Sequence, residues 1–382
     1  MIPSDTISRF LEPLDVLFLR GNQLFGDPGS YGEALIPPWP SVAAGAIRTR
    51  ILTDAGIDPV AFGKGQLPHP ELGTPECPGS FMLRAFNLAR LRDGKIEILL
   101  PPPSDLALHA TKGMVRAQRL VPTKLHPALR TSSPLPLLPV LAQSARSKTI
   151  NGWWLRQSGW QKYLAGHTPD GTDFVRTSDL WSLDERVGVG LADATRSADD
   201  GKLFTSRAIA LKDNVGFIAA VAGATLPDHG MLRFGGDGRA ATIRPATIDW
   251  PHADYAAITA SSRCRLVLTS PGIFTQGWLP NGFIADGSTY RFDLGDVQGR
   301  LVAASVTRNE VVSGWNLAGT QGKGQPKPAQ RVAPAGSVYW LDELQASPDA
   351  LRKLAANGLW RNPCEDAQRH AEGFNRFSLA LY

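Results

Sequence analysis

Short apolar runs separated by turn-forming residues are the main pattern in this chain. Strand-like runs occur at Leu203–Leu211, Val215–Ala224, Arg263–Thr269 and Gly299–Thr307, and an alternating run closes the chain at Tyr382. The sequence also contains 38 glycines and 30 prolines, residues that interrupt regular structure. The pattern therefore predicts a protein in which loops and short strands outnumber long helices.

The N-terminal part predicts a strand, a loop and a helix in succession. The apolar run Leu14–Arg20 is typical of a buried strand, and it leads into the polar loop Gly21–Gly26. Ser41 is a candidate N-cap, because apolar residues after it share one helical face: Val42, Ala46, Ile47 and Ile51. Strand, loop and helix open a ferredoxin-like unit, the fold that RNA-recognition motifs also use.

Two turn signals separate neighbouring strand-like runs. Asp93-Gly94 separates the runs Phe81–Asp93 and Lys95–Leu100, which predicts a hairpin. Lys212-Asp213-Asn214 separates the two central strand-like runs.

A glycine-rich loop flanked by arginines, LRFGGDGR, ends at Arg239. Gly235 and Gly236 bring no side chain to bury, so we expect their backbone N–H groups to face outward. Arg233 and Arg239 beside them indicate an anionic partner. A tight hairpin turn is the alternative explanation, and the sequence leaves both open.

Basic residues are unevenly distributed in a chain whose net charge is +5. Between Leu106 and Pro169 there are nine Lys or Arg residues and no Asp or Glu. Such a field favours a polyphosphate partner. We interpret Lys112–Pro169 as an inserted basic segment, whose tryptophans serve either as core residues or as stacking platforms for bases.

A second acid-free stretch, Val311–Leu341, carries Lys323, Lys327 and Arg331. Its middle, Gly319–Pro328, is rich in Gly, Gln and Pro. This composition predicts a mobile loop that becomes ordered on a partner. A passive connector is the alternative.

Several kinds of chemistry are not indicated. Three widely spaced cysteines argue against a disulfide framework, and no Cys/His group has the spacing of zinc ligands. HExxH, Walker and Gly-x-Ser-x-Gly motifs are missing. The N-terminus lacks the layout of a signal peptide, and the apolar run Val215–Leu226 is too short to span a bilayer. We expect a soluble cytoplasmic protein without cofactor or metal.

The motifs, in their order and spacing, resemble a known family. They are LDVLFLRGNQLFG, PPWPSVAAGAIR, ERVGVGLADATRSADDGKLF, LRFGGDGR, SGW followed by PKP, and PAGSVYWL. The sequence resembles the RAMP superfamily of CRISPR-associated proteins and, within it, the third-subunit family of the type III-B Cmr effector complex. One departure is the terminal loop EGFNRF, in which Asn375 stands where a second glycine is typical.

The resemblance implies an α+β protein with two ferredoxin-like domains, residues 1–200 with the insertion at 112–169, and residues 201–382 with a mobile loop at 319–331. It implies a non-catalytic subunit that grips the 5′ handle of the CRISPR RNA beside the large polymerase-like subunit and a backbone subunit. A thumb-like hairpin, for which the basic insertion is the candidate, would reach the duplex of guide and target RNA.

Combining the loops with the resemblance, we obtain a candidate set of RNA-binding residues: Arg20, Gly21, Asn22, Gln23, Phe25, Ser41, Arg48, Arg186, Arg233, Gly235, Gly236, Arg239, Ser313, Trp315, Lys323, Lys327 and Arg331. Two alternatives stay open. One is a metal-independent endoribonuclease that processes CRISPR RNA, with His370 as the candidate base. The other is the equivalent subunit of a type III-A Csm complex.

Overall fold

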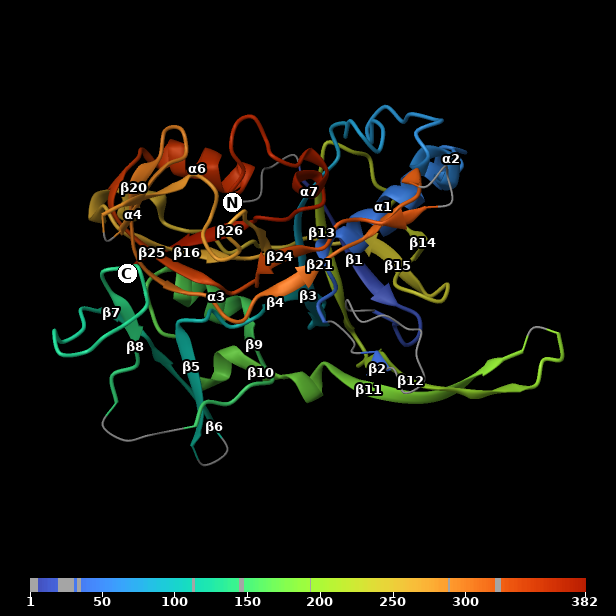
Figure 1. Cartoon of the computed structure of the whole chain (residues 1–382), viewed down its shortest axis with the longest axis horizontal. Coiled ribbons are helices and arrows are strands. Elements are labelled where there is room, and N and C mark those ends of the chain that lie inside the picture. The colour runs from blue at the N-terminus through green and yellow to red at the C-terminus, as the bar shows by residue number, and fades with distance from the viewer. Residues whose placement is uncertain are drawn as a thin grey trace.

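The computed structural model (Figure 1) describes residues 6–19, 31–32, 36–111, 114–143, 148–192, 194–287, 289–319 and 324–382. Within these ranges the protein is a mixed α+β fold with two large sheets, and the strand pairs are antiparallel except for the pair β12 and β2. The predicted α+β class and the excess of strands over helices are therefore confirmed.

The first sheet has eight strands, which lie in the order β10 (Phe174–Arg176), β9 (Trp153–Arg156), β4 (Lys95–Leu100), β3 (Met82–Arg92), β13 (Val215–Ala222), β1 (Ile7–Pro13), β15 (Ala240–Pro245) and β14 (Gly230–Arg233). The second has six, in the order β18 (Phe283–Asp286), β19 (Thr289–Asp293), β20 (Gln298–Ser305), β25 (Val338–Gln345), β16 (Cys264–Leu268) and β26 (Phe377–Ala380).

Smaller sheets surround these two. One contains β11 (Trp181–Leu191), β12 (Ala198–Leu211) and β2 (Tyr31–Gly32), and another contains β17 (Gly272–Ile273), β24 (Gln330–Ala333) and β21 (Glu310–Val312). Three two-stranded ribbons are β5 (Leu106–Thr111) with β6 (Met114–Arg119), β7 (Val121–Thr123) with β8 (Leu138–Val140), and β22 (Trp315–Asn316) with β23 (Gln325–Pro326).

The helices are short apart from the first. They are α1 (Pro40–Asp54), α2 (Pro59–Gly63), α3 (Gln157–Leu164), α4 (Tyr255–Ser261), α6 (Pro348–Asn357) and α7 (Ala367–Ala371), with single turns of 3-10 helix at Gly171–Asp173 and Thr177–Asp179. None of the helices in the ranges given above is long and apolar enough to cross a membrane.

Alternating side chains bury both faces of each large sheet. In β1, Leu11 packs with α1 in one hydrophobic cluster, whereas its neighbour Phe10 faces a second cluster. That second cluster also contains Ile218 of β13 and Trp340 of β25. The two large sheets therefore share one buried apolar layer, and burial on both faces explains why β13 is apolar throughout.

Two local predictions are confirmed. β3 and β4 form the expected hairpin, with Asp93 and Gly94 both at positive φ. Lys212–Asn214 is also a turn, in which the Val215 N–H bonds the Lys212 carbonyl. The strands on either side of this turn do not pair with each other, because β12 pairs with β11 while β13 lies between β1 and β3.

The first predicted strand, Leu14–Arg20, is wrong. The strand is Ile7–Pro13, and the segment after it makes a single bridge, Leu17 to Ile209. Leu17 and Leu19 are buried beside the first sheet rather than in it. An apolar run therefore marked burial correctly but not backbone conformation.

The basic segment Lys112–Pro169 is not one separate insertion. Its second half supplies β9 of the first sheet and α3, whose Trp160 and Tyr163 are buried in the layer between the large sheets. Trp154 is also buried, and Trp153 is partly exposed, so these tryptophans serve mainly as core. The first half supplies β6, which pairs with β5 just before the segment, and the ribbon β7–β8.

The element that projects from the body is instead the long hairpin of β11 and β12 (Figure 1). Residue 200, the predicted boundary between the two domains, lies inside β12. The first large sheet continues past it to Pro245, and the first strand of the second sheet starts at Cys264.

Candidate nucleic-acid interface

Three of the predicted RNA-binding residues line one cleft although they are far apart in the sequence. Arg48 of α1, Trp315 of β22 and Lys327 after β23 face a cavity of about 270 Å³. Lys64 and Glu372 line it as well. The cleft therefore combines cations with an aromatic ring. Proteins that bind single-stranded RNA use cations for the phosphates and aromatic rings for stacking on the bases.

Arg48 is held in place by the elements packed around α1. Its guanidinium lies 4.8 Å from the centre of the Phe81 ring and its Nη1 lies 4.0 Å from a carboxylate oxygen of Glu372. Burial lowers the pKa of Arg48, and the Glu372 charge opposes that shift. The side chain keeps 22% of its surface exposed, so it can also reach a ligand in the cleft.

The opposite wall is the ribbon β22–β23. Trp315 is 57% exposed. A Cβ at Gly324 would collide with its indole, so only glycine lets the backbone at residue 324 pack against the ring. Lys327 Nζ donates to Gln368 Oε1 at 3.2 Å, and Ser313 Oγ donates to the Lys327 carbonyl at 2.8 Å. Ser313 therefore positions the strand that presents Lys327.

The glycine-rich loop is a tight turn between β14 and β15. Gly235 has φ +86°, a left-handed value that favours glycine, and the Gly236 N–H donates to the Phe18 carbonyl at 2.8 Å. The prediction that the backbone donors face outward is therefore wrong for Gly236. The hairpin turn, which the sequence left open, is the observed conformation.

The arginines of this region gather around one aromatic ring. Arg186 of β11 and Arg239 lie 5.8 and 5.3 Å from the centre of Phe18. Each also pairs with a carboxylate, Arg186 with Asp184 and Arg239 with Asp15. These pairs offset part of the positive charge that the sequence pattern indicated, whereas Arg233 is exposed on β14.

The other predicted residues separate into three groups. Arg20, Gly21, Asn22, Gln23, Phe25 and Lys323 lie outside the described residues. Ser41 does not cap α1: the helix begins at Pro40, whose ring favours the first helical position, and Trp39 is the N-cap. Arg331 lies on β24 and lines a different pocket.

The terminal loop is part of the core. Phe374 and Asn375 have no exposed surface, and the Arg376 guanidinium donates to the carbonyls of Ala355 and Ala356. Burial, with the neighbouring Arg84 charge, lowers the pKa of Arg376 to about 9. Sequence reasoning missed this buried role, because the positive φ of Asn375 and its burial are visible only in the structure.

His370 lies on α7, where its Nε2–H faces the Asn357 carbonyl at 3.0 Å and its ring lies 5.7 Å from that of Trp360. Burial and the charge of Arg376 lower its pKa to about 4. The imidazole of His370 is therefore neutral, and its hydrogen bond to a backbone carbonyl gives it a structural role. The described residues also contain no group of three His, Cys, Asp or Glu that could hold a metal.

This shift predicts a pH dependence of stability. The unfolded chain takes up a proton at His370 near pH 6.5, but the folded protein does so only near pH 4. The free energy of unfolding should therefore fall as the pH drops through this window. Urea titrations at several pH values should show a smaller fall for His370→Gln, and an unchanged fall would contradict the assignment.

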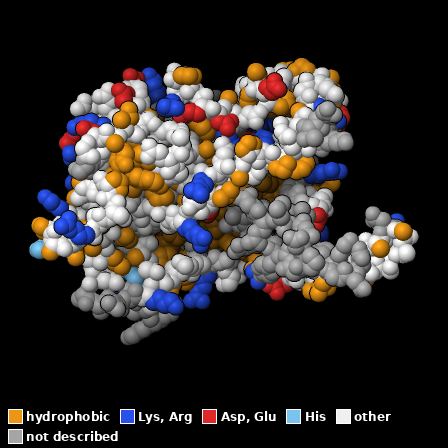
Figure 2. Space-filling view, viewed as in Figure 1, with side chains coloured by type: hydrophobic (Ala, Val, Ile, Leu, Met, Phe, Trp, Pro, Cys, Tyr) orange, Lys and Arg blue, Asp and Glu red, His pale blue; other side chains and the backbone are white. Residues whose placement is uncertain are grey.

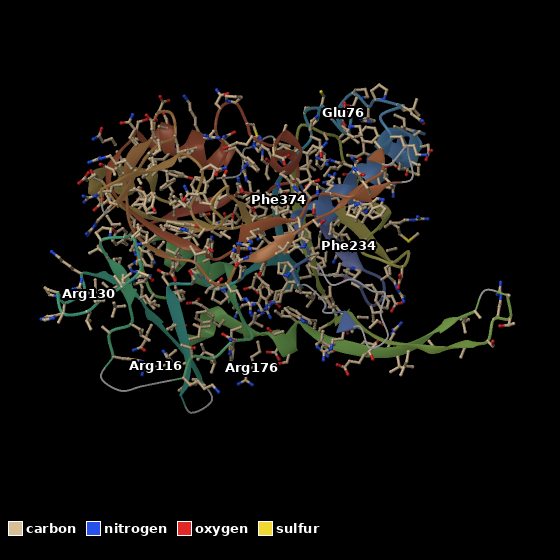
Figure 3. The ribbon with its side chains drawn as sticks, in the orientation of Figure 1. Glu76, Arg116, Arg130, Arg176, Phe234 and Phe374 are labelled. Atoms are coloured by element: carbon tan, nitrogen blue, oxygen red, sulfur yellow. The ribbon has the colours of Figure 1, made fainter. Side chains whose placement is uncertain are left out.

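Basic side chains also follow the edge formed by the ribbons and the first sheet. Figure 2 shows Lys and Arg along the lower edge of the molecule, and Figure 3 places Arg116, Arg130 and Arg176 there. All three are exposed, and Arg176 lies over the Trp153 ring at 5.0 Å. The basic residues that the sequence pattern indicated are therefore exposed on one surface. This surface extends toward the start of the β11–β12 hairpin.

Comparison with known proteins identifies the class. A family model described as "CRISPR-associated protein (Cas_Cmr3)" matches residues 9–380. The protein is thus a CRISPR-associated protein. More specifically, it belongs to the Cas_Cmr3 family, which confirms the resemblance in the sequence and supports a subunit of a type III-B Cmr ribonucleoprotein.

No curated protein matches the sequence, whereas 23 chains of solved structures do. The chain is similar to one in the cryo-EM structure of the type III-B Cmr-beta bound to cognate target RNA, with 13% identity, TM-score 0.45 and 98% of each chain covered. For the same complex with AMPPnP, state 1, the values are 12%, 0.44 and 98%.

Proposed function

We propose that this protein is a non-catalytic RNA-binding subunit of a type III-B Cmr effector complex. It would hold the 5′ handle of the CRISPR RNA beside the large polymerase-like subunit and a backbone subunit. The observation that carries the proposal is the cleft in which Arg48, Trp315 and Lys327 meet. A guanidinium and an ammonium would bind phosphates, while the exposed indole would stack on a base.

The strand order supports two ferredoxin-like units within the fold. In the first sheet β3, β13, β1 and β15 are neighbours, and in the second β20, β25, β16 and β26 repeat the arrangement. In both sets the first strand in the chain lies between the third and the fourth. α1 joins the first two strands of one set, and α6 joins the last two of the other. This matches a ferredoxin-like connection.

The β11–β12 hairpin suits the thumb-like role better than the basic ribbons do, because it projects from the body. Its register places Val189 opposite Leu203, and both side chains are exposed, at 42% and 60%. An apolar surface on a projecting ribbon could lie against the bases of a guide–target duplex, with Arg186 nearer the body for the phosphates. A cytoplasmic location stays a prediction.

RNA binding by the cleft can be tested with the purified chain. Single-stranded RNA should bind, and the triple variant Arg48→Ala, Trp315→Ala, Lys327→Ala should bind at least about 100-fold more weakly. Each charged contact is worth about 1.5–3 kcal/mol at most, and each stacked base about 1–3 kcal/mol. Wild-type affinity should fall steeply with salt, because binding releases counterions.

The matched control removes two positive charges, one of them from the helix that carries Arg48, and neither residue lines the cleft. Arg50 lies on α1 two positions from Arg48 and pairs with Asp54, and Lys353 is exposed on α6. Arg50→Ala with Lys353→Ala should leave RNA affinity nearly unchanged. Equal losses in both variants, or a flat salt response of the wild-type chain, would show that the cleft does not bind RNA.

A further inference from the structure

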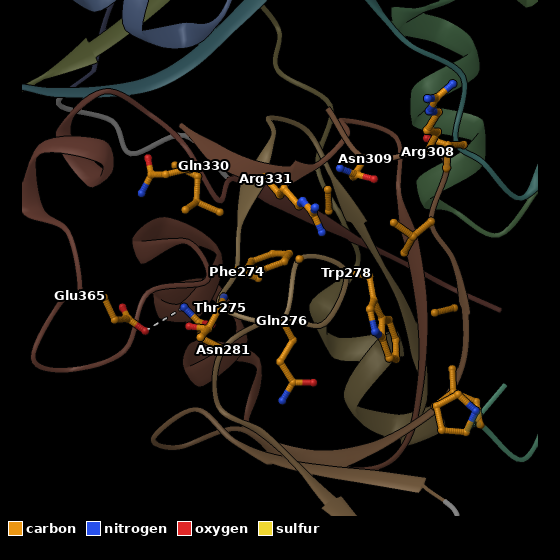
Figure 4. Close-up of a pocket in the computed structure, with 18 of the residues that line it drawn as sticks. Phe274, Thr275, Gln276, Trp278, Asn281, Arg308, Asn309, Gln330, Arg331 and Glu365 are labelled. Atoms are coloured by element: carbon orange, nitrogen blue, oxygen red, sulfur yellow. Dashed lines mark hydrogen bonds between the residues drawn. The ribbon is translucent and has the colours of Figure 1, made fainter. Parts of the chain in front are cut away.

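A second large cavity lies near the N-terminal end of α7, a helix that lines the proposed RNA cleft. It has a volume of about 1020 Å³ and is lined by residues of the second half of the chain, with Ser133, Pro134 and Leu135 closing one side. Its size suits a small organic ligand or a nucleotide. Figure 4 shows Arg331 directed toward the cavity, with Phe274 and Trp278 in its walls.

The two arginine side chains of this pocket are free to bind a ligand, whereas the Glu365 carboxylate already accepts hydrogen bonds from neighbouring side chains. The guanidinium groups of Arg308 and Arg331 make no hydrogen bond or ion pair with any residue in the described ranges, and both residues are exposed. Glu365 accepts from Arg361 and from Asn281, at 2.7 and 3.2 Å (Figure 4). The pocket therefore offers two unpaired guanidinium groups to an anion.

The pocket also holds a positioned aromatic ring. The Trp278 ring packs edge-on against Tyr290 with centroids 5.9 Å apart, and its backbone carbonyl accepts from the Tyr339 hydroxyl. Trp278 is half-buried, so part of the indole faces the cavity. A ring fixed in this way can stack on a planar group without losing further rotamer freedom.

Two uncharged amides complete the set. Gln276 and Asn309 line the pocket, are exposed, and form no side-chain hydrogen bond within the described part of the chain. Amide side chains donate and accept together, which matches the edge of a nucleobase. The pocket thus offers groups for the phosphate, for the planar face of the base and for its polar edge.

Continuity with the first cleft indicates that this nucleotide belongs to a strand. Lys327 lines the first cleft and Gln330 lines this pocket, and three residues of extended chain span about 10 Å. The start of α7 also lies between them, since Gln368 of the helix lines the cleft and the N-cap residue Asp366 lines the pocket. One or two nucleotides of extended RNA would bridge the two sites.

We infer that this pocket receives one unstacked nucleotide of the single-stranded RNA that occupies the neighbouring cleft, an inference that rests on the proposed function. Arg308 and Arg331 bind its phosphates, Trp278 stacks on its base, and Gln276 and Asn309 contact the base edge.

The test uses the full chain and a fluorescent single-stranded RNA of about 12 nucleotides, within the range that such sites cover. Arg308→Ala with Arg331→Ala should weaken binding about tenfold or more and make the slope of log affinity against log salt shallower by about 1 to 2. The control, Arg263→Ala with Lys353→Ala, removes two exposed charges elsewhere and should change neither quantity.

Trp278 supplies a second, independent readout. RNA containing 4-thiouridine should cross-link to the peptide that holds Phe274 and Trp278. Trp278→Ala should lose at least about fivefold in affinity, and Trp278→Phe should recover most of it, because stacking needs only an aromatic face. Adenosine monophosphate should compete only weakly, since it lacks the contacts in the first cleft.

The outcomes separate this inference from the proposed function. If the wild-type chain binds no RNA, both are overturned. If the first cleft is needed for binding but the pocket variants bind normally and no cross-link forms, only the pocket inference is wrong. Normal RNA binding with lost copurification of other Cmr subunits would make the pocket a protein-docking site, which also overturns it. Mononucleotide binding as tight as RNA binding would overturn the link to a strand.

Discussion

Replacing Asp105 by alanine should lower the free energy of unfolding by about 3–5 kcal/mol. Asp105 and Arg265 have no exposed side-chain surface, and Oδ2 of Asp105 lies 2.8 Å from Nη1 of Arg265. The alanine variant leaves the guanidinium buried without its counter-charge. It also removes the acceptor of the Tyr163 hydroxyl, which donates to Oδ1 of Asp105 at 2.8 Å. Urea unfolding at neutral pH measures the loss.

Two comparisons isolate the buried pair. The double variant Asp105→Ala, Arg265→Met removes both charges and should be much less destabilised than the sum of the two single variants. Asp286→Ala breaks the pair with Arg291, whose side chains are 55% and 57% exposed, and should cost no more than about 1 kcal/mol. Equal losses for Asp105→Ala and Asp286→Ala would contradict the prediction.

This buried pair bears on function because of where its members lie. Asp105 precedes β5, Tyr163 lies on α3 and Arg265 lies on β16 of the second sheet. The Arg265 guanidinium also donates to the carbonyls of Tyr163 and Leu381, so one side chain ties the second large sheet to α3 and to the segment before β5. Since the proposed RNA cleft takes Arg48 from one half of the chain and Lys327 from the other, its shape depends on how those halves are held.

Local signals predicted local structure well. Asp93-Gly94 gave its hairpin because both residues tolerate positive φ, and the predicted N-cap Ser41 lies two residues after Trp39, the observed N-cap of α1. By contrast, β1 has the sequence ISRFLEP, in which Arg9 and Glu12 weaken the apolar pattern. Arg9 is nevertheless 7% exposed, because it donates to Pro227 and pairs with Asp228. The more apolar run after it therefore resembled the strand more closely.

The candidate site could be predicted only in part, since composition shows charge but not proximity. Arg48, Trp315 and Lys327 were each identified, but only the fold brings α1 next to β22. Conversely, Arg186 and Arg239 stood out in sequence, while their partners Asp184 and Asp15 became apparent only from side-chain geometry. The β11–β12 hairpin was missed as a projection because its exposed valines and leucines have the alternation of a packed strand.

Asn375 should prove to be a structural residue rather than an RNA contact. Its φ is +60° and its side chain is fully buried. Oδ1 accepts from the Ile273 N–H at 2.6 Å, and Nδ2 donates to the carbonyls of Ile273 and Leu359 at 3.4 and 3.2 Å. Asparagine therefore does what a second glycine could not, because it tolerates the left-handed backbone and also joins two neighbouring segments.

We expect Asn375→Ala to lower the free energy of unfolding by about 3–5 kcal/mol, since it leaves buried polar groups without partners and keeps a strained backbone. Asn375→Gly relieves the strain, costs about 1 kcal/mol less, and should bind RNA as the wild type does while folded. Thermal or urea unfolding and RNA titration of the same preparations give both numbers. If the glycine variant is stable but binds RNA more weakly, the loss of binding must come from the removed Asn375 side chain. That outcome would assign the terminal loop to the RNA interface.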